Sequence, residues 1–184
     1  FSERKEFPQY TSDLKGNYQE YNKRTVVQAI NVLQKYWGIS QAHIKAGLNN
    51  TIKNTGLLGR WQILKSNPLT LCDTAHNKEG LTLVLNQLQK LNFEQLHIVL
   101  GVVNDKDLES ILPLFPTTAK YYFCKPNVPR GLDPSILKSI AETFNLYGEM
   151  YDSILNAYNS AKDIATEKDT IFIGGSTFVV AEVL

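Results

Sequence analysis

The stretch Leu69-Thr70-Leu71-Cys72-Asp73-Thr74-Ala75-His76-Asn77 decides the fold, because a short apolar run passes directly into a polar cluster. A helical pattern over Lys78–Leu91 follows, so the cluster lies where a strand ends and a helix begins. In open α/β sheets, ligands bind at this carboxyl edge of the strands. The stretch therefore predicts a strand–loop–helix unit whose loop carries chemistry rather than core packing.

The same alternation continues over residues 57–184. Repeated strand–helix units predict an α/β domain with a Rossmann-like, mostly parallel sheet of about six strands and right-handed crossovers. The run from Leu96 to Val103 is apolar almost throughout, as expected for a strand covered on both faces. The expected strands are Trp61–Lys65, Leu69–Cys72, Leu96–Val102, Lys120–Cys124, Glu149–Tyr151 and Thr170–Gly174. The expected helices are Lys78–Leu91, Lys106–Leu112, Pro134–Phe144, Ser153–Ala165 and Ser176–Val183.

Residues 1–56 show a different pattern, in which one short extended segment, Phe7–Leu14, precedes two helical patterns. Apolar residues at helical spacing predict an amphipathic helix over Glu20–Trp37, and Ser40 as an N-cap predicts a second helix over Gln41–Lys53. These elements make a poor core alone, and the sequence begins without Met. We expect residues 1–56 to be the mainly helical end of a domain, in a piece of a longer protein.

The composition is typical of a soluble globular protein, since 43% of the 184 residues are hydrophobic and 20% are charged. A formal net charge of +1 predicts neither nucleic-acid nor membrane binding. No apolar run approaches the roughly 20 residues that span a bilayer. Cys72 and Cys124 both lie in strand-like runs, which favours buried reduced thiols in a cytoplasmic protein over a disulfide between neighbouring strands.

The polar residues after the second strand have both chemical and structural interpretations. Asp73 can accept hydrogen bonds from ribose hydroxyls or orient His76, and it can equally cap the next helix. His76 can bind phosphate or donate a proton, or it can be a loop histidine bonded to the backbone. Asn77 is most simply the N-cap of the following helix, whose positive end would favour a phosphate.

Two further loops, Asn104–Asp107 and Gly174–Thr177, are expected at the same edge of the sheet. In the first, Lys106 lies between two acids, which is consistent with a ligand contact or with a self-paired charge cluster. In the second, Ser176 is consistent with a ligand contact or with a tight turn and an N-cap. Arg60, before the first strand, can bind phosphate or be an exposed structural arginine.

Several enzyme classes are excluded by missing motifs. The sequence contains no Gly-Lys dipeptide, so no Walker A phosphate loop is present. It contains no G-x-G-x-x-G, which argues against a dinucleotide-dependent dehydrogenase. Its glycine–serine segment is not a G-x-S-x-G elbow, so a serine hydrolase is not expected.

Five short motifs follow one another along the chain. Leu14-Lys15-Gly16-Asn17-Tyr18-Gln19-Glu20-Tyr21-Asn22 is similar to L-x-G-x-H-Q-x-x-N, and Leu58-Gly59-Arg60 to P-G-R. Asp73-Thr74-Ala75-His76-Asn77-Lys78 is similar to D-G-A-H-N-P, and Asp105-Lys106-Asp107 to D-K-D. The segment from Gly175 to Val183 is similar to G-S-x-x-x-V-x-E-V. In this order they resemble folylpolyglutamate synthase and dihydrofolate synthase of the Mur ligase superfamily, over the C-terminal part of such an enzyme.

The resemblance implies an ATP-dependent ligation. ATP phosphorylates a carboxylate of dihydropteroate or tetrahydrofolate, and the amine of L-glutamate attacks the acyl phosphate to give an amide, ADP and phosphate. Residues 57–184 would be the Mur ligase C-terminal domain and residues 1–56 the tail of the central ATPase domain, with the nucleotide between them. The phosphate loop and Mg²⁺ ligands would lie in the N-terminal ATPase part, so no metal site is expected here, and a cytoplasmic monomer is expected.

Carried over residue by residue, the motifs assign ATP contacts to Asn22, Arg60, Asp73 and Asn77, and a catalytic role to His76 beside the phosphates or the reacting carboxylate. The candidate contacts to substrate or phosphate are Lys106, Asp107 and Ser176.

The chain departs from the family motifs at four positions, which are Tyr18, Leu58, Thr74 and Lys78. Thr74 adds a side chain where the backbone would approach the ligand. Two alternatives stay open: the C-terminal domain of a peptidoglycan Mur ligase, and a non-catalytic nucleotide-contacting or docking module. The chain alone is expected to be inactive.

Overall fold

The computed structural model describes residues 10–184. The chain divides into two compact units, one up to Leu58 and one from Gly59 to Leu184. The first part of the expected extended segment Phe7–Leu14 lies outside the described residues. Tyr10–Leu14 forms no strand, so the expectation of a strand there was wrong for the part that is described.

The N-terminal unit contains three helices: α1 (Gln19–Leu33), α2 (Gln41–Asn49) and α3 (Thr51–Thr55). Ser40 caps α2 as predicted, because its hydroxyl accepts a hydrogen bond from the His43 amide at 3.2 Å while the His43 ring accepts one from the Ser40 amide.

The structure departs from both predicted helices of this unit. The first ends at Leu33 instead of Trp37, because the Lys35 amide donates to the carbonyl oxygen of Val32 and tightens the last turn. The second is interrupted at Asn50, whose backbone (φ −128°, ψ 30°) leaves the helical region.

The C-terminal unit is built on one six-stranded sheet with the strand order β1-β2-β6-β3-β4-β5. β1 is antiparallel to β2, and all other neighbours are parallel. The predicted α/β fold with a mostly parallel six-stranded sheet is therefore confirmed. The strands are β1 (Gln62–Ser66), β2 (Leu69–Cys72), β3 (Leu96–Leu100), β4 (Lys120–Cys124), β5 (Gly148–Tyr151) and β6 (Thr170–Gly174).

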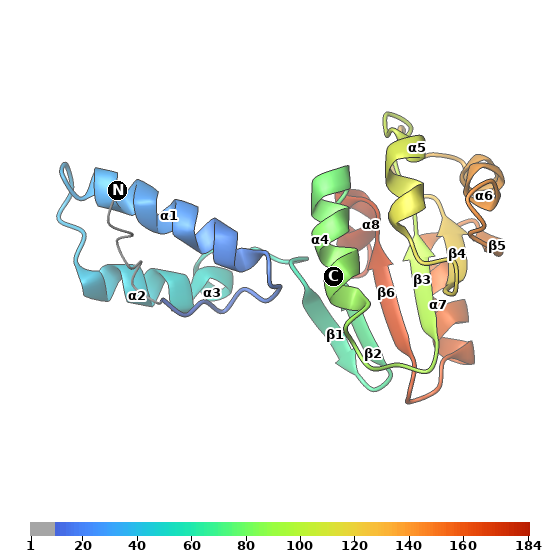
Figure 1. Cartoon of the computed structure of the whole chain (residues 1–184), viewed down its shortest axis with the longest axis horizontal. Coiled ribbons are helices and arrows are strands. Elements are labelled where there is room, and N and C mark those ends of the chain that lie inside the picture. Colours follow the sequence, from blue (N-terminus) through green and yellow to red (C-terminus); the bar gives the residue numbers. More distant parts are fainter. Residues whose placement is uncertain (1–9) are drawn as a thin grey trace, which may run out of the picture. The chain divides into compact units, whose positions relative to one another are not determined.

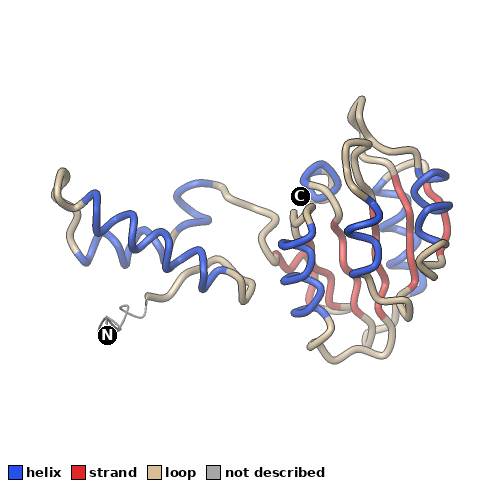
Figure 2. Tube along the Cα trace, turned by 45° about the horizontal axis from the view of Figure 1, so that its top comes forward, coloured by secondary structure: helices blue, strands red, loops and turns tan. Residues whose placement is uncertain are grey.

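Helices cover both faces of this sheet, as Figures 1 and 2 show. α7 contacts β3 to β6 on one face, and α8 contacts β6. α4 contacts the short α5 and the 3-10 helix η1, and Figure 1 shows α4 and α5 in front of the sheet with α7 behind it. The bounds are α4 (Lys78–Leu88), α5 (Leu108–Ile111), η1 (Leu112–Leu114), α6 (Pro134–Glu142), α7 (Ile154–Ile164) and α8 (Thr177–Ala181).

The predicted helix Lys106–Leu112 forms only a short α-turn followed by η1. Asp107 caps the turn by accepting a hydrogen bond from the Ser110 amide at 3.2 Å, so the helix begins at Leu108. Pro113 carries no N–H for an α-helical bond, and the segment tightens to a 3-10 helix.

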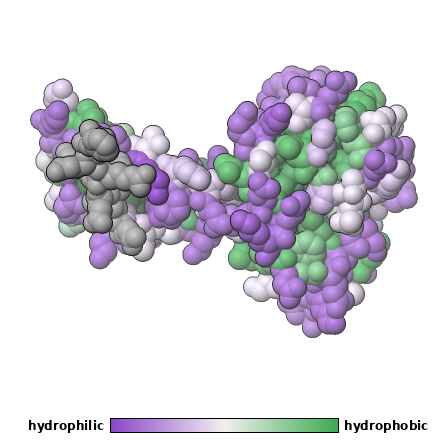
Figure 3. Space-filling view, in the orientation of Figure 1, coloured by the Kyte–Doolittle hydropathy of each residue, from purple (hydrophilic) through white to green (hydrophobic). Residues whose placement is uncertain are grey.

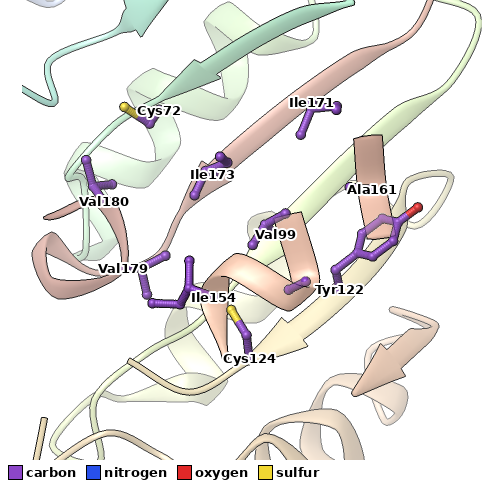
Figure 4. Close-up of a cluster of buried hydrophobic side chains, with 11 residues drawn as sticks. Cys72, Val99, Tyr122, Cys124, Ile154, Ala161, Ile171, Ile173, Val179 and Val180 are labelled. Atoms are coloured by element: carbon purple, nitrogen blue, oxygen red, sulfur yellow. The ribbon is translucent and has the colours of Figure 1, made fainter. Parts of the chain in front are cut away.

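The core between the sheet and α7 and α8 contains both cysteines (Figure 4). Cys72 on β2 and Cys124 on β4 are fully buried and free, which confirms the prediction of reduced thiols. β6 and β3 lie between their strands, so the two residues are not cross-strand neighbours and a disulfide cannot form. Burial, with a smaller contribution from the Asp73 carboxylate, raises the pKa of Cys72 to about 12, and burial likewise raises the pKa of Cys124.

A buried polar group lies at the amino-terminal edge of the sheet. The ring of His97 bonds the Tyr122 hydroxyl through Nδ1 at 2.8 Å, and its Nε2 lies 3.6 Å from a carboxylate oxygen of Asp169. The same carboxylate accepts hydrogen bonds from the backbone of Thr166 and Gln95. Burial lowers the pKa of His97, although Asp169 opposes this effect.

We expect the free energy of unfolding to fall as the pH falls below about 6.5, the pKa of an unfolded histidine. In this range the unfolded chain binds a proton that native His97 does not, so acid favours unfolding with a slope of at most about 1.4 kcal/mol per pH unit. Urea unfolding between pH 7.5 and 5 measures the slope. His97→Gln should reduce it, whereas the exposed His43→Gln should retain it; equal slopes in both variants would contradict the assignment.

Within residues 10–184, no helix is long and apolar enough to cross a membrane. Figure 3 shows hydrophobic residues reaching the visible surface as patches among polar ones. The exposed apolar side chains include Leu83, Ile136 and Met150.

Candidate functional site

The carboxyl ends of β2, β6 and β3 lie side by side. Cys72 pairs with Ile173 and Leu100 pairs with Gly174, so the loops that follow these three parallel strands leave the same edge of the sheet. The prediction that these loops converge is confirmed. The edge therefore brings together the loops that carry His76, Lys106 and Ser176.

Asp73 joins two loops at this edge. Its side chain is buried, with 2% of its surface exposed. One carboxylate oxygen accepts a hydrogen bond from the Trp61 amide at 2.7 Å, and the other accepts one from the Ala75 amide at 2.8 Å. Asp73 thereby fixes the chain directly after Arg60 and directly before His76, while helix α4 is capped by Asn77.

The turn before β1 carries Arg60, and Asp73 bonds the residue that follows it. Trp61 is buried and has φ +49°, a left-handed backbone that costs energy for a bulky residue. This conformation starts β1 one residue later than predicted and is held by the bond to Asp73. The guanidinium of Arg60 is partly exposed, and its only described hydrogen bond is a long one of 3.4 Å to the carbonyl oxygen of Gly59. Arg60 is thus placed by the turn with its donors largely unused.

His76 is exposed and has a defined orientation. Its Nδ1 lies 3.0 Å from the carbonyl oxygen of Thr74. Because a carbonyl only accepts, Nδ1 carries the proton in this bond, and Nε2 of the neutral ring is left as an acceptor facing away from it. The interpretation of His76 as a loop histidine bonded to the backbone is therefore confirmed, and its role toward a ligand stays a prediction.

Asn77 and Ser176 act as helix caps. The side chain of Asn77 accepts a hydrogen bond from the Gly80 amide at 2.9 Å and begins α4. The hydroxyl of Ser176 accepts one from the Phe178 amide at 3.2 Å, and Ser176 is buried. The tight turn before it needs glycine, because Gly175 has φ +95° and a Cβ there would lie 2.6 Å from Leu100. Neither side chain is left free for a ligand without losing its cap.

In the loop after β3, the two acids on either side of Lys106 bind partners other than that lysine. Asp105 forms an ion pair of 2.9 Å with Arg130, and Asp107 caps α5. Of the two interpretations of this loop, the self-paired charge cluster is therefore wrong, because both acids have partners other than Lys106. The sequence motifs did not include Arg130; the signal that could have revealed it is its position in the loop after the predicted strand Lys120–Cys124, next to Gly131.

Asn22 lies on α1 of the N-terminal unit, where its side-chain amide donates to Gln19 at 2.9 Å. It lines a cavity of about 310 Å³ between α1 and α2, whose walls are mostly apolar and include Val26, Ile30 and Ile44. The structure describes this unit by itself, so the prediction that Asn22 shares a nucleotide with the residues of the C-terminal unit stays a prediction.

Among residues 10–184, no group of three or more His, Cys, Asp or Glu side chains is arranged to hold a metal ion. Two groups at the edge could bind the phosphates of a nucleotide. Arg60 offers unused guanidinium donors, and the capped N-terminus of α4 follows the loop that carries His76. Nε2 of His76 is an acceptor while Nδ1 carries the proton, so it would bind a phosphate oxygen only in the protonated ring.

This combination of a mostly parallel sheet and polar loops at its carboxyl edge defines an α/β ligand-binding domain. Residues 59–177 match the family "Mur ligase, glutamate ligase domain", and the chain belongs to this family. The resemblance to its folate enzymes is confirmed by the comparisons with known proteins.

Two curated relatives have folate enzyme names. A probable bifunctional folylpolyglutamate synthase/dihydropteroate synthase of Haloferax volcanii is 30% identical over 73% of this chain and 16% of the relative. The dihydrofolate synthase/folylpolyglutamate synthase of Escherichia coli is 27% identical over 79% of this chain and 33% of the relative. The chain thus spans a third or less of the length of these relatives.

Among solved structures, the bifunctional folylpolyglutamate synthase/dihydrofolate synthase of Yersinia pestis, complexed with AMPPNP and a Mn ion, superimposes with a TM-score of 0.69. It is 25% identical and covers 84% of this chain and 36% of that protein.

Proposed function

We propose that the chain is the C-terminal part of an ATP-dependent folate–glutamate ligase. The observation that carries the proposal is the buried Asp73, which ties Arg60 and His76 into one loop pair at the carboxyl edge of a Mur ligase family domain. The folate enzyme names of the relatives support the substrate class.

In the proposed reaction, a carboxylate oxygen of dihydropteroate or tetrahydrofolate takes the γ-phosphoryl group of ATP, and ADP leaves. The amine of L-glutamate then attacks the acyl carbon, phosphate leaves, and the amine loses a proton. Arg60 would bind the phosphate oxygens, because a guanidinium forms paired hydrogen bonds with them. His76, whose Nε2 is free, would act beside the phosphates or the reacting carboxylate. Asp73 would hold both residues in place.

The remaining proposed contacts follow the family motifs. Asn22 and Asn77 would contact ATP, and Lys106, Asp107 and Ser176 would contact substrate or phosphate. Because Asn77, Asp107 and Ser176 already cap helices, we propose that they act mainly by fixing the loops.

The nucleotide in this proposal is ATP with a divalent metal ion, and the AMPPNP and Mn ion of the Yersinia pestis enzyme support it. We propose Mg²⁺ as the metal, held by the N-terminal part of the parent protein. We also propose that residues 1–56 are the tail of the central ATPase domain and residues 57–184 the Mur ligase C-terminal domain. That N-terminal ATPase domain would be the partner of this chain in a cytoplasmic, monomeric enzyme.

The test is an assay of the parent protein for ATP- and L-glutamate-dependent extension of dihydropteroate and of tetrahydrofolate, followed by mass spectrometry and ADP release. We expect an amide product and one ADP for each glutamate added. Turnover with a muramyl substrate and not with a pterin would replace the proposal by a peptidoglycan Mur ligase.

The same assay applied to the 184-residue chain tests whether this part of the enzyme is active without the rest of the parent protein. We expect no ATP hydrolysis, because the chain has no Walker A loop. ATP hydrolysis by the chain alone would contradict the proposal that the N-terminal part of the parent protein carries the ATPase activity.

A further inference from the structure

The loop between β4 and α6, Lys125–Asp133, is fixed against the loop that follows β3. The Asn104 amide donates to the carbonyl oxygen of Arg130 at 2.9 Å, and the Leu132 amide donates to that of Val102 at 3.0 Å. Val103 and Gly131 form an isolated bridge. A Cβ on Gly131 would lie 2.4 Å from the carbonyl oxygen of Pro126, so no other residue fits this turn. The backbone therefore holds Arg130 beside the loop that carries Lys106.

The side chain of Arg130 is held at two points. Its Nη1 lies 2.9 Å from Asp105, and its guanidinium carbon lies 5.0 Å from the ring centroid of Phe178 on α8. Both members of the ion pair are about half exposed. Exposed pairs of this kind contribute little to stability, so stability alone gives no reason for the arrangement.

Within the described residues, the ion pair between Arg130 and Asp105 leaves Lys106 without an acidic partner. Of the two acids beside it in sequence, Asp105 is paired with Arg130, and Asp107 accepts a hydrogen bond from the Ser110 amide. In the part of the chain that the structure describes, the ammonium of Lys106 forms no hydrogen bond or ion pair, and the residue is partly exposed at the carboxyl edge. Without Arg130, the unpaired carboxylate of Asp105 would lie next in sequence to this cation and weaken its attraction for an anion.

We propose that Arg130 is a positioning residue: by pairing with Asp105 it leaves Lys106 as the cation that binds an anionic oxygen group at the carboxyl edge. The anion is a phosphate of the nucleotide or a carboxylate of the amino acid, and only this choice of ligands rests on the proposed function. Arg130 itself remains paired with Asp105 and stacked on Phe178 when the anion binds.

The test is an NMR titration of the ¹⁵N-labelled 184-residue chain at low ionic strength, with ADP in one arm and L-glutamate in the other. We expect the amides of Asn104–Asp107 to shift with at least one of the two anions, and Lys106→Gln to remove the shift. Arg130→Gln should weaken binding by about threefold or more, whereas Arg130→Lys should retain most of it. Lys168→Gln breaks another exposed ion pair, with Glu94, and should change nothing.

A double variant distinguishes positioning from direct contact. Asp105→Asn removes the charge that Arg130 neutralises, so Arg130→Gln in the Asp105→Asn background should bind as tightly as the wild type. If the double variant binds as weakly as Arg130→Gln alone, Arg130 contacts the anion and the proposal is wrong. If Arg130→Gln does not fold, Asp105→Asn alone decides, because weaker binding than wild type would contradict the proposal. No shift in either arm would also overturn it. The titration measures anion binding and does not depend on ligase activity. A negative ligase assay would therefore contradict the proposed function without contradicting the role of Arg130.

Discussion

Asp73→Ala is expected to lower the free energy of unfolding of the C-terminal unit by about 3 kcal/mol. The variant removes the carboxylate that accepts hydrogen bonds from the Trp61 and Ala75 amides, and each such bond to a charged group contributes about 1.5–3 kcal/mol. It also releases the left-handed backbone of Trp61. Urea unfolding of the 184-residue chain, followed by circular dichroism, measures the change.

Two matched variants control this prediction. Asp73→Asn keeps one acceptor oxygen, so it should cost about half as much. Asp107→Ala removes an exposed carboxylate that caps a short helix, and its cost should be about 1 kcal/mol or less. If Asp73→Ala is no more destabilising than Asp107→Ala, the carboxylate of Asp73 does not hold the two loops together.

Arg60→Ala in the parent enzyme is expected to lower kcat by at least about tenfold, because the proposed cationic contact to the transferring phosphoryl group would be lost. The free energy of unfolding should change little, since within residues 10–184 the guanidinium forms only a long bond to Gly59. Steady-state kinetics with ATP as the varied substrate measure the effect. Arg60→Lys keeps the charge but not the paired donors, so it should recover only part of the rate. Unchanged kinetics in Arg60→Ala would remove this residue from the proposed site.

The two predictions separate two roles. Asp73→Ala should reduce both stability and turnover, whereas Arg60→Ala should reduce turnover alone. A temperature series shows the difference, because cooling should restore part of the activity of the Asp73 variant and none of that of the Arg60 variant. Asp73 is thus expected to behave as a positioning residue, although the family motif places it among the ATP contacts.

The strands were predictable because their signals are local and strong. The run Leu96–Leu100 is buried throughout, as expected for a strand between two helical layers, and each predicted strand of the C-terminal unit is present within one to two residues. The helix ends were less predictable, because single residues decide them. Asn50 interrupts one helix and Pro113 tightens another into a 3-10 turn, where periodicity alone continues the pattern.

The sequence predicted which loops meet at the candidate site, but it did not predict the hydrogen bonds and ion pairs between them. Parallel strands bring their loops to one edge, so the convergence of the loops with His76 and Lys106 followed from topology. The roles within them depend on contacts between residues far apart in sequence. The bond from Trp61 to Asp73 and the ion pair between Arg130 and Asp105 join positions 12 and 25 residues apart, which no local pattern reveals.

The position of β6 has a consequence for the synthesis of the protein. β6 is the last strand of the described chain, yet it lies between β2 and β3. Until residues 170–174 have left the ribosome, each of these two strands has an open hydrogen-bonding edge in a region of buried side chains. The unit therefore completes its fold late, and nascent chains stopped before residue 170 should be bound by chaperones that recognise exposed strand edges.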